Sequence, residues 1–334
     1  MRAWQISSFG IDSLEFVERP QPVPGPGEVL VAVRAVSLNY RDLLVIKGKY
    51  NPRLALPRIP CSDGAGEVVE AGSGVGRWRP GDRVMGIFMQ NWLEGQLTRA
   101  RAKGALGGDV DGMLTDLVVL KETGLIEIPE HLSYQEAATL PCAAVTAWNA
   151  LTAGNVKPGD TVLILGTGGV SIFALQFARL RGARVIGVSS SNEKLERARA
   201  IGLDAGLNYR ENPEWDRWAM DQTGGEGVDT IVEVGGSGTL PRSLRAVRFG
   251  GTIAQIGVLA GSAEPVVIPQ IVHKWTRVQG IYVGSRQDFV AMNRAVSLAQ
   301  MRPVGEEFHW TQAREVMEKM EEGSHFGKMV LTVS

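Results

Sequence analysis

Apolar residues follow two alternating patterns in the second half of the chain. One is a short unbroken apolar run, typical of a buried strand, and the other is an apolar spacing of three and four residues, typical of a helix. The run at residues 162–165 leads through glycines into a helical pattern at residues 172–178. Further strand patterns lie at residues 184–188, 206–209, 228–234 and 252–256. This alternation predicts an α/β fold with a doubly wound parallel sheet.

The first part of the chain has a different pattern, because glycine and proline interrupt short β-type runs up to about residue 140. Residues 28–36 form an almost unbroken apolar strand pattern, and residues 65–72 add another. After a last strand of the parallel sheet predicted at residues 277–284, residues 288–300 are helical, and residues 302–334 add a strand, a helix and a strand. We therefore predict a compact β-rich domain in addition to the doubly wound one.

The glycine-rich turn after residues 162–165 predicts a phosphate site. A pyrophosphate binds the unpaired N–H groups in the first turn of a helix, and a side chain at Gly166 or Gly168 would block its approach. Ser171 stands where the dinucleotide-binding fingerprint has its third glycine, and a small hydroxyl still lets the helix pack on the strand. A plain surface turn is the alternative, but the pattern that follows favours a Rossmann domain. The residues assigned to this turn are Gly166, Thr167, Gly168, Gly169 and Val170.

The end of the second strand indicates which dinucleotide is bound. Enzymes that prefer NAD place an acidic residue there, which accepts the ribose hydroxyls and repels a 2′-phosphate. Here Ser189 and Ser190 are neutral hydrogen-bond donors, and Lys194 follows one helical turn later, so we predict NADP(H). The alternative is that this segment only caps a helix and that Lys194 is a solvated surface residue. Two residues at the ends of later strands are also assigned to the cofactor, Tyr209 and Gly257.

Length and charge exclude several classes of protein. The chain has 334 residues, enough for two domains, and a formal net charge of -1 gives no reason to expect nucleic acid or an anionic membrane as a partner. Two cysteines are too few for a disulfide framework, the N-terminal residues lack the apolar core of a signal peptide, and no apolar run is long enough to span a bilayer. These features predict a cytoplasmic protein that acts on a small molecule.

Several motifs together resemble the medium-chain dehydrogenase/reductase superfamily. They are Gly-Glu-Val-Leu-Val at residues 27–31, Gly-Asp-Arg-Val at residues 81–84, the central glycine turn and the closing segment at residues 325–331. The chain is most similar to the zinc-independent branch that contains quinone oxidoreductases and enoyl reductases. The resemblance implies a GroES-like catalytic domain of residues 1–142 and 286–334, a Rossmann NADP-binding domain of residues 143–285, and a homodimer formed through an edge strand at residues 281–283.

The resemblance also bears on metal binding. Zinc alcohol dehydrogenases of this superfamily hold the catalytic zinc with a cysteine, a histidine and a second cysteine, and the matching positions here are Asn39, Ser62 and Cys142. Asn and Ser are poor zinc ligands, and residues 90–110 contain no cysteine for the structural zinc lobe of such enzymes. We therefore expect no zinc. Without this Lewis acid, interconversion of alcohols and ketones is the less favoured chemistry.

The favoured reaction is hydride transfer from NADPH to a conjugated C=C bond or a quinone. Tyr40 is the candidate proton donor or enolate stabiliser, and Asn39 is a candidate hydrogen-bond donor to the substrate oxygen or to the nicotinamide ribose. Asp42 is expected to orient Tyr40 or Arg41. The alternative for these residues is a helix start, in which Asn39 is the cap and Asp42 complements the helix dipole.

Further residues are assigned by position. Thr146 matches a threonine that lies beside the nicotinamide in the superfamily, with helix packing as the alternative, and Lys328 is expected to contact a cofactor phosphate. Cys142 is interpreted as a small buried residue at the domain junction rather than a ligand or nucleophile. The candidate walls of a substrate pocket, which could equally be core, are Tyr50, Phe88, Trp92 and Cys142.

Two other functions stay open. One is an alcohol dehydrogenase with an atypical zinc site. The other is a non-catalytic NADPH-binding protein, like the crystallin relatives of the superfamily. The sequence has no basic stripe with interleaved aromatic residues, which RNA binding would favour.

Overall fold

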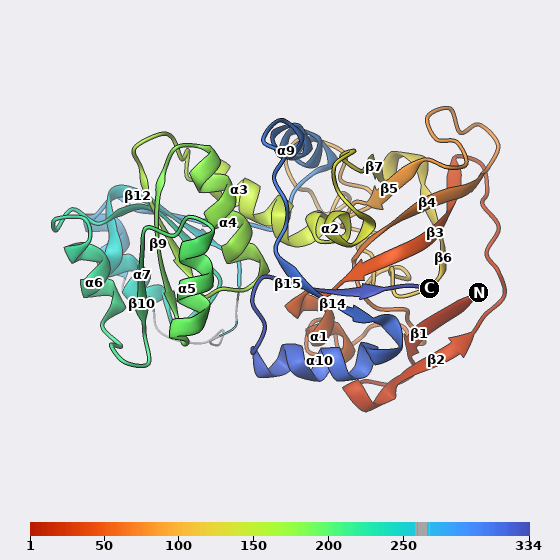
Figure 1. The fold of residues 1–334 in the computed structure, drawn as a ribbon, viewed down its shortest axis with the longest axis horizontal. Helices are drawn as coiled ribbons and strands as arrows, with labels where there is room; N and C mark the ends of the chain where they lie inside the picture. Colours follow the sequence, from red (N-terminus) through yellow and green to blue (C-terminus); the bar gives the residue numbers. More distant parts are fainter. Residues whose placement is uncertain (258, 260–265, 267) are drawn as a thin grey trace. The chain divides into compact units, whose positions relative to one another are not determined.

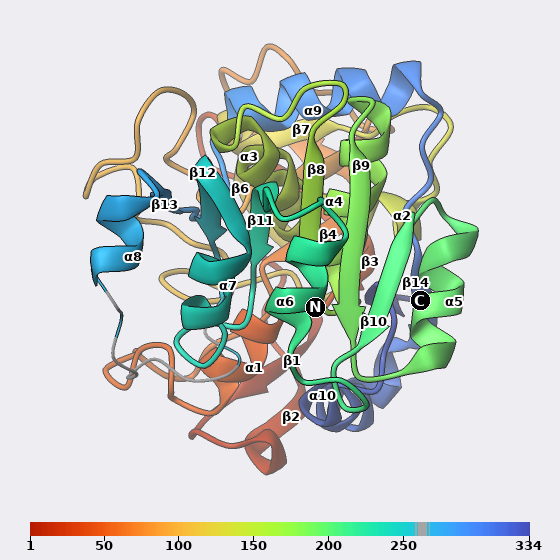
Figure 2. The ribbon, with the colours of Figure 1, turned by 90° about the vertical axis from the view of Figure 1, so that its left-hand side faces the viewer.

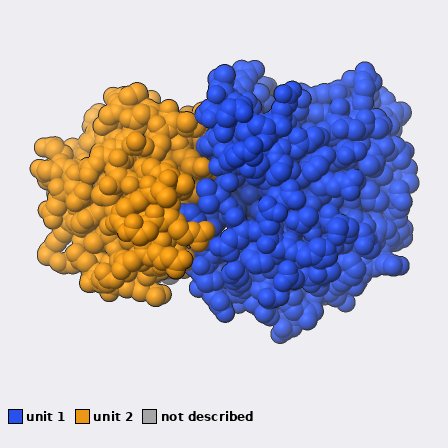
Figure 3. Space-filling model, viewed as in Figure 1, with its two compact units in different colours: residues 1–145, 284–334 blue, residues 146–283 orange. Residues whose placement is uncertain are grey.

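The computed structural model describes residues 1–257, 259, 266 and 268–334, which divide into two compact units (Figure 1). Unit 1 contains residues 1–145 and 284–334, and unit 2 contains residues 146–283 (Figure 3). The chain therefore leaves unit 1, forms unit 2 without interruption and returns to unit 1. The junctions expected from sequence, after residue 142 and before residue 286, lie within a few residues of these.

Unit 1 is built on a largely antiparallel sheet in the order β14-β15-β3-β4-β5-β7, with β6 also paired to β3. β3 has ten residues, so its first half pairs with β6 and its last residues pair with β15, while β4 pairs along its other edge. A separate hairpin joins β1 and β2. The strands are β1 (Arg2–Ile6), β2 (Leu14–Glu18), β3 (Glu28–Ser37), β4 (Asp63–Ala71), β5 (Arg83–Gly86), β6 (Leu117–Lys121), β7 (Leu125–Glu127), β14 (Gly305–His309) and β15 (Lys328–Thr332).

The helices of unit 1 follow the polar residues Asn39, Ser133, Ser285 and Gln312. α10 has an apolar face of Val316, Met317 and Met320 that joins the same core as the sheet, and it packs against α1 (Figure 1). The helices are α1 (Tyr40–Ile46), α2 (Tyr134–Ala138), α9 (Arg286–Leu298) and α10 (Ala313–Glu322).

The pairing of β3 gathers polar residues at its carboxyl end. Ser37, the last residue of β3, lies opposite Asp63 of β4 on one side and Val330 of β15 on the other. Lys328 begins β15, and Asn39 follows β3 directly before α1. Segments that are far apart in sequence therefore meet at one end of one strand.

Unit 2 has six parallel strands in the order β10-β9-β8-β11-β12-β13 (Figure 2). Numbered along the chain this is the order 3-2-1-4-5-6 of a Rossmann fold, as expected from the sequence. The strands are β8 (Thr161–Leu165), β9 (Arg184–Ser189), β10 (Ala205–Asn208), β11 (Val228–Glu233), β12 (Val247–Gln255) and β13 (Arg277–Gly280). The helices are α3 (Val145–Ala153), α4 (Gly169–Leu180), α5 (Asn192–Ala200), α6 (Trp215–Asp221), α7 (Leu240–Ala246) and α8 (Ile268–His273).

One strand expectation was wrong. β13 ends at Gly280, so residues 281–283 do not continue it as an edge strand. Val283 has a φ of 53°, a left-handed conformation that a β-branched residue rarely adopts and that interrupts a regular strand. The apolar run misled the prediction because the backbone turns at its end. Among the described residues, none of the helices is both long and apolar enough to cross a membrane.

Candidate active site

The turn after β8 has the geometry of a phosphate-binding loop. Gly166 adopts a φ of 73°, which favours glycine, and its N–H donates to the carbonyl of Val188 on the neighbouring strand at 2.7 Å. Gly168 then precedes α4, a helix of twelve residues. The first-turn N–H groups of such a helix attract an anion through hydrogen bonds and the helix dipole. These residues fit the pyrophosphate of a dinucleotide.

Ser171 replaces the third glycine of the fingerprint with a definite contact. It is 1% exposed, and its hydroxyl donates to the carbonyl of Leu165, the last residue of β8, at 2.7 Å. This bond ties the first turn of α4 to the strand that precedes it. The departure from glycine therefore stabilises the strand–turn–helix unit.

The end of β9 carries the residues expected to select the dinucleotide. Ser189 is 2% exposed and its Oγ accepts from the N–H of Ser191 at 3.4 Å. Ser191 in turn caps α5, where its Oγ accepts from the N–H of Lys194 at 3.3 Å. Ser190 and Lys194 are half-buried. The capping role considered from sequence is thus present, and it leaves the cofactor role of these side chains as a prediction.

A carboxylate near this strand end was missed by the sequence analysis. Glu211 Oε1 accepts from the side-chain amides of Asn192 at 2.6 Å and Asn208 at 2.9 Å. Tyr209, which is two-fifths exposed, stays close to β9 because its N–H donates to the carbonyl of Ser189 at 3.0 Å. No sequence spacing indicated Glu211, because its two partners come from different elements.

Glu233 is a second carboxylate that the sequence analysis did not single out. It ends β11, is fully buried, and accepts from the N–H of Gly235 at 2.8 Å, the N–H of Gly236 at 3.2 Å and the hydroxyl of Thr239 at 2.6 Å. Ser243 Oγ also donates to it. β11 is next to β8, and doubly wound folds bind ligands at the carboxyl ends of such strands. Glu233 therefore shapes the loop at this edge, and an acid directly after the apolar residues 231 and 232 was the available signal.

Gly257 follows β12 close to the same loop. A Cβ built on it would lie 2.0 Å from the carbonyl oxygen of Val234, so only glycine fits there. Thr146 lies in α3 and is 3% exposed, in agreement with the packing alternative. Contact of either residue with the cofactor stays a prediction.

Unit 1 holds a buried chain of hydrogen bonds at the end of β3. The ammonium of Lys328 donates to Asn39 Oδ1 at 2.6 Å, Asn39 Nδ2 donates to Ser62 Oγ at 3.4 Å, and the Ser62 hydroxyl donates to Asp63 Oδ1 at 2.7 Å. Asp63 Oδ2 accepts from the N–H of Cys142 at 3.0 Å. The three positions that match zinc ligands, residues 39, 62 and 142, are therefore joined by hydrogen bonds within the protein.

Asp42 and Arg41 lie against this chain. Asp42 is fully buried, accepts from the N–H of Asn39 at 2.9 Å and pairs with Arg41 at 3.4 Å. Asp42 thus forms the helix start that the sequence analysis gave as the alternative, and it contacts Arg41 as also expected. Tyr40 is 40% exposed, in contrast to its buried neighbours. Its exposure leaves the phenol available to a ligand.

Burial sets the protonation behaviour of this cluster. Desolvation raises the pKa of Asp63 to about 6, although the ammonium of Lys328 opposes the rise, and desolvation also raises the pKa of Asp42. Desolvation and the nearby Asp63 carboxylate raise the pKa of the Cys142 thiol. A thiol with a raised pKa is a poor nucleophile, in agreement with the interpretation from sequence.

The raised pKa of Asp63 makes stability depend on pH. Between its ordinary value of 3.8 and about 6 the folded protein binds more protons than the unfolded chain, so the free energy of unfolding should fall as the pH rises through this interval. The expected fall is on the order of 3 kcal/mol. Chemical denaturation of wild type and Asp63→Asn between pH 4 and 7 measures it. Equal slopes for the two proteins would contradict the assignment.

The candidate pocket walls are divided between surface and core. The guanidinium of Arg41 lies 5.1 Å from the ring centre of Tyr50 and 4.9 Å from that of Phe88, so it brings these aromatic side chains together. Tyr50 is 39% exposed, whereas Phe88 and Trp92 are buried, and Trp92 Nε1 donates to the carbonyl of Gly95 at 2.8 Å. Phe88 and Trp92 are thus core residues of unit 1, which was the alternative interpretation.

The side chains at residues 39 and 62 already have hydrogen-bond partners within the protein. Asn39 Oδ1 accepts from an ammonium, and the Ser62 hydroxyl donates its proton to Asp63. Asn and Ser are poor zinc ligands, and the expected absence of zinc stays a prediction. No cluster of three or more His, Cys, Asp or Glu side chains suited to a metal occurs in the described part of the chain.

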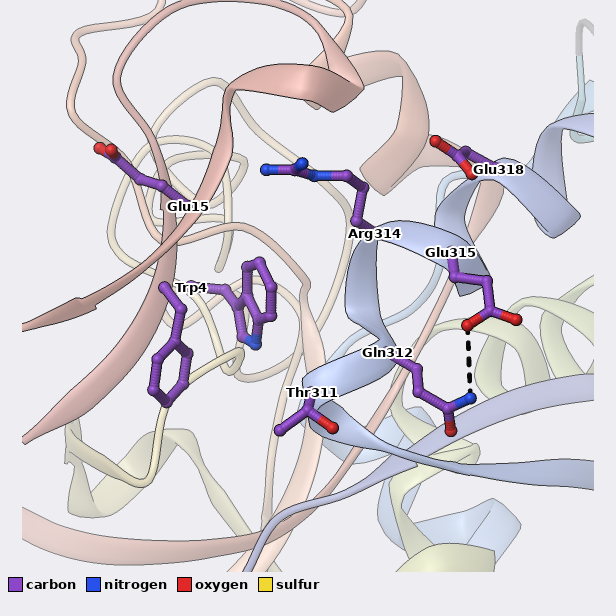
Figure 4. Close-up of a pocket in the computed structure, with 8 residues that line it drawn as sticks. Trp4, Glu15, Thr311, Gln312, Arg314, Glu315 and Glu318 are labelled. Carbon is purple, nitrogen blue, oxygen red and sulfur yellow. Dashed lines mark hydrogen bonds between the residues drawn. The ribbon is translucent and has the colours of Figure 1, made fainter.

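A separate hollow of about 530 Å³ lies in unit 1 between the β1–β2 hairpin and α10 (Figure 4). Trp4 and Phe16, whose ring centres lie 5.5 Å apart, line it together with Arg314 and Glu315 of α10. Arg314 donates to the carbonyl of Leu14 at 2.7 Å. The residues assigned from sequence are not among those that line this hollow, so it is distinct from the candidate site.

Family models match both parts of the chain. Residues 25–130 match the alcohol dehydrogenase GroES-like domain, and residues 169–297 match a domain described as zinc-binding dehydrogenase. These matches agree with the β-rich and Rossmann parts of the fold.

Relatives match over nearly the full length. A zinc-type alcohol dehydrogenase-like protein of Schizosaccharomyces pombe is 42% identical over 98% of this chain and 97% of its own. An acryloyl-coenzyme A reductase of Metallosphaera sedula is 29% identical over 95% of this chain and 96% of its own. The crystal structure of a putative alcohol dehydrogenase from Sinorhizobium meliloti superposes with a TM-score of 0.93 at 39% identity, covering 99% of this chain and 98% of that one.

Proposed function

The chain belongs to the medium-chain dehydrogenase/reductase superfamily and is an NAD(P)H-dependent oxidoreductase, and on this basis we propose that it reduces a conjugated C=C bond or a quinone with NADPH and without a metal. The observation that carries the proposal is the hydrogen-bonded chain from Lys328 to Asp63. It engages the side chains at residues 39 and 62, where relatives of the zinc type have ligands. The polar atoms there stabilise charge by hydrogen bonding.

The residues of unit 1 supply what such a reduction requires. NADPH, when bound, supplies a hydride to the β-carbon of the acceptor, and negative charge then develops on the acceptor oxygen. Tyr40 donates a hydrogen bond or a proton to that oxygen, because its phenol is exposed, and Asn39 donates a second hydrogen bond through its amide. Donors fixed in place before the reaction stabilise the developing charge without reorganisation.

NADP(H) is the proposed cofactor. The glycine turn and the start of α4 bind the pyrophosphate, and Ser189, Ser190 and Lys194 meet the 2′-phosphate at the end of β9. The reductase of Metallosphaera sedula, named for an unsaturated thioester, is one relative whose name agrees with reduction of an activated C=C bond.

The alternative is an alcohol dehydrogenase with an atypical zinc site, which the names of other relatives favour. Purified protein of known zinc content should be tested for oxidation of NADPH, with NADH in parallel, against quinones, enones, enoyl thioesters and simple aldehydes. Turnover of conjugated acceptors by metal-free protein supports the proposal. Activity confined to simple carbonyls and abolished by a chelator would favour the alternative, and tight NADPH binding without turnover would favour a non-catalytic protein.

We also propose that the protein forms a homodimer through the open edge of the parallel sheet. All four residues of β13 are exposed, and the apolar side chains of Trp275, Val272 and Ile268 beside it are 84%, 68% and 60% exposed. A second copy that covers this edge would bury these side chains and pair the strand. Sedimentation velocity should give a mass near twice 36.0 kDa, and a monomer at micromolar concentration would contradict the proposal.

A further inference from the structure

Lys328 is a buried cation whose contacts determine which way the neighbouring hydrogen-bonding groups point. It is 3% exposed, and its ammonium donates to the carbonyl of Leu38 at 2.5 Å and to Asn39 Oδ1 at 2.6 Å. Its backbone N–H donates to the carbonyl of Val304 at 3.0 Å, so the start of β15 is held in place. The ammonium therefore has a fixed position relative to the amide.

An ammonium only donates hydrogen bonds, whereas an amide has one accepting end and one donating end. With Lys328 charged, the oxygen of Asn39 must face the ammonium, and the Nδ2 hydrogens must face the other way. One of these N–H groups meets Ser62 Oγ, whose own proton is directed to Asp63. The cation at one end and the carboxylate at the other thus orient every group between them, and such polarised chains strengthen each bond.

We propose that Lys328 is a positioning residue that orients the Asn39 amide so that its N–H, rather than its oxygen, is presented to the acceptor oxygen of the substrate. The inference rests on the proposed function, since it gives Asn39 the role of a hydrogen-bond donor. An amide of the opposite orientation would present an acceptor and repel the developing negative charge. Lys328 itself does not contact the substrate in this arrangement.

Two other roles of Lys328 make different predictions. If it binds a cofactor phosphate, as its position in the sequence suggests, its removal should raise the Kd of NADPH. If it only compensates the buried carboxylates of Asp63 and Asp42, its removal should lower stability independently of Asn39. A positioning role predicts a loss of kcat that depends on the presence of Asn39.

A double-mutant cycle tests this dependence. Lys328→Met and Asn39→Ala should each lower kcat by roughly 10- to 100-fold, which is the worth of a hydrogen bond to a charged group. The double variant should be no slower than Asn39→Ala alone. The Kd of NADPH, from fluorescence titration, should be unchanged in all three. Multiplied losses of kcat in the double variant, or a raised Kd with normal kcat in Lys328→Met, would overturn the proposal.

Asn39→Asp separates orientation from packing. Aspartate keeps an oxygen for the Lys328 ammonium but has no N–H, so kcat should fall as far as in Asn39→Ala while the melting temperature stays higher than in that variant. Lys319→Met is the matched control, because Lys319 lies on α10, pairs with Glu306 and is outside the buried chain. Wild-type kcat in Asn39→Asp would overturn the proposal.

Removing Lys328 alone leaves Asp63 without a buried cation and can prevent folding. The cycle is then repeated in the Asp63→Asn background, where the charges of the two residues are removed together.

If wild type reduces none of the acceptors, the proposed function has failed. The orientation of the amide is then tested separately through the ¹⁵N–¹H resonances of the Asn39 side chain, which are identified by their loss in Asn39→Asp. Lys328→Met should shift them, and unchanged resonances would overturn the inference.

Discussion

Ser189→Asp is expected to move the cofactor preference from NADPH towards NADH by roughly 100-fold in the ratio of the two kcat/KM values. Ser189 is the last residue of β9, so the new carboxylate would lie at the carboxyl edge of the parallel sheet. There it accepts hydrogen bonds from the ribose hydroxyls of NADH and repels a 2′-phosphate. Two unit charges about 6 Å apart at an effective dielectric of about 20 interact by roughly 3 kcal/mol, and about 1.4 kcal/mol is tenfold.

The control is Ser189→Asn, which has nearly the same shape as the aspartate without its charge. Steady-state kinetics with both cofactors should show little change in the ratio for Ser189→Asn and a large change for Ser189→Asp. The same ratio in wild type and Ser189→Asp would remove the support for NADP selection at the end of β9. Equal shifts in the two variants would assign the effect to crowding in this buried position.

Tyr40→Phe is expected to lower kcat by at least about 100-fold, within the range for loss of a general acid, and to leave NADPH binding unchanged. Tyr40 is the exposed first residue of α1, so removing its hydroxyl creates no buried cavity and should have little effect on stability. The measurement is kcat with a quinone and an enone, together with the Kd of NADPH and the melting temperature.

Tyr134→Phe is the matched control. Tyr134 likewise begins a helix of unit 1, and its hydroxyl donates to Glu67 at 3.4 Å instead of belonging to the candidate site. It should keep wild-type kcat. If Tyr40→Phe also keeps it, Tyr40 has a structural role only, and the proton comes from another group or from water.

The fold could be predicted from local patterns of apolar residues in the sequence. Alternating strand and helix patterns in residues 162–256 predicted a doubly wound sheet, and the observed strand order is that of a Rossmann fold. The predicted and observed ends of an element differ where the backbone conformation ends the element before the apolar pattern does. At Val283 a left-handed residue prevents the strand that the apolar run had indicated.

Only part of the candidate site could be predicted from the sequence. The positions of Asn39, Ser62 and Cys142 could be found from motifs, because each stands in a recognisable local context. Their partner Lys328 was assigned to a phosphate, and its contact with Asn39 could not be foreseen because almost the whole chain separates the two residues. Phe88 and Trp92 were candidates for a pocket wall, but both side chains are buried in the structure.

The sequence by itself determined the order of elements, the glycine turn and the residue types at positions 39, 62 and 142, because these depend on neighbours within a few residues. Only the tertiary structure decided which side chains are joined by hydrogen bonds and which carboxylates are buried. The pairing of β3 with both β4 and β15 brings Asp63 and Lys328 to one end of a strand. Desolvation at that place, and not residue type, raises the pKa of Asp63. The hydrogen bonds from Lys328 through Asn39 and Ser62 to Asp63 place the Asn39 amide between a cation and an anion.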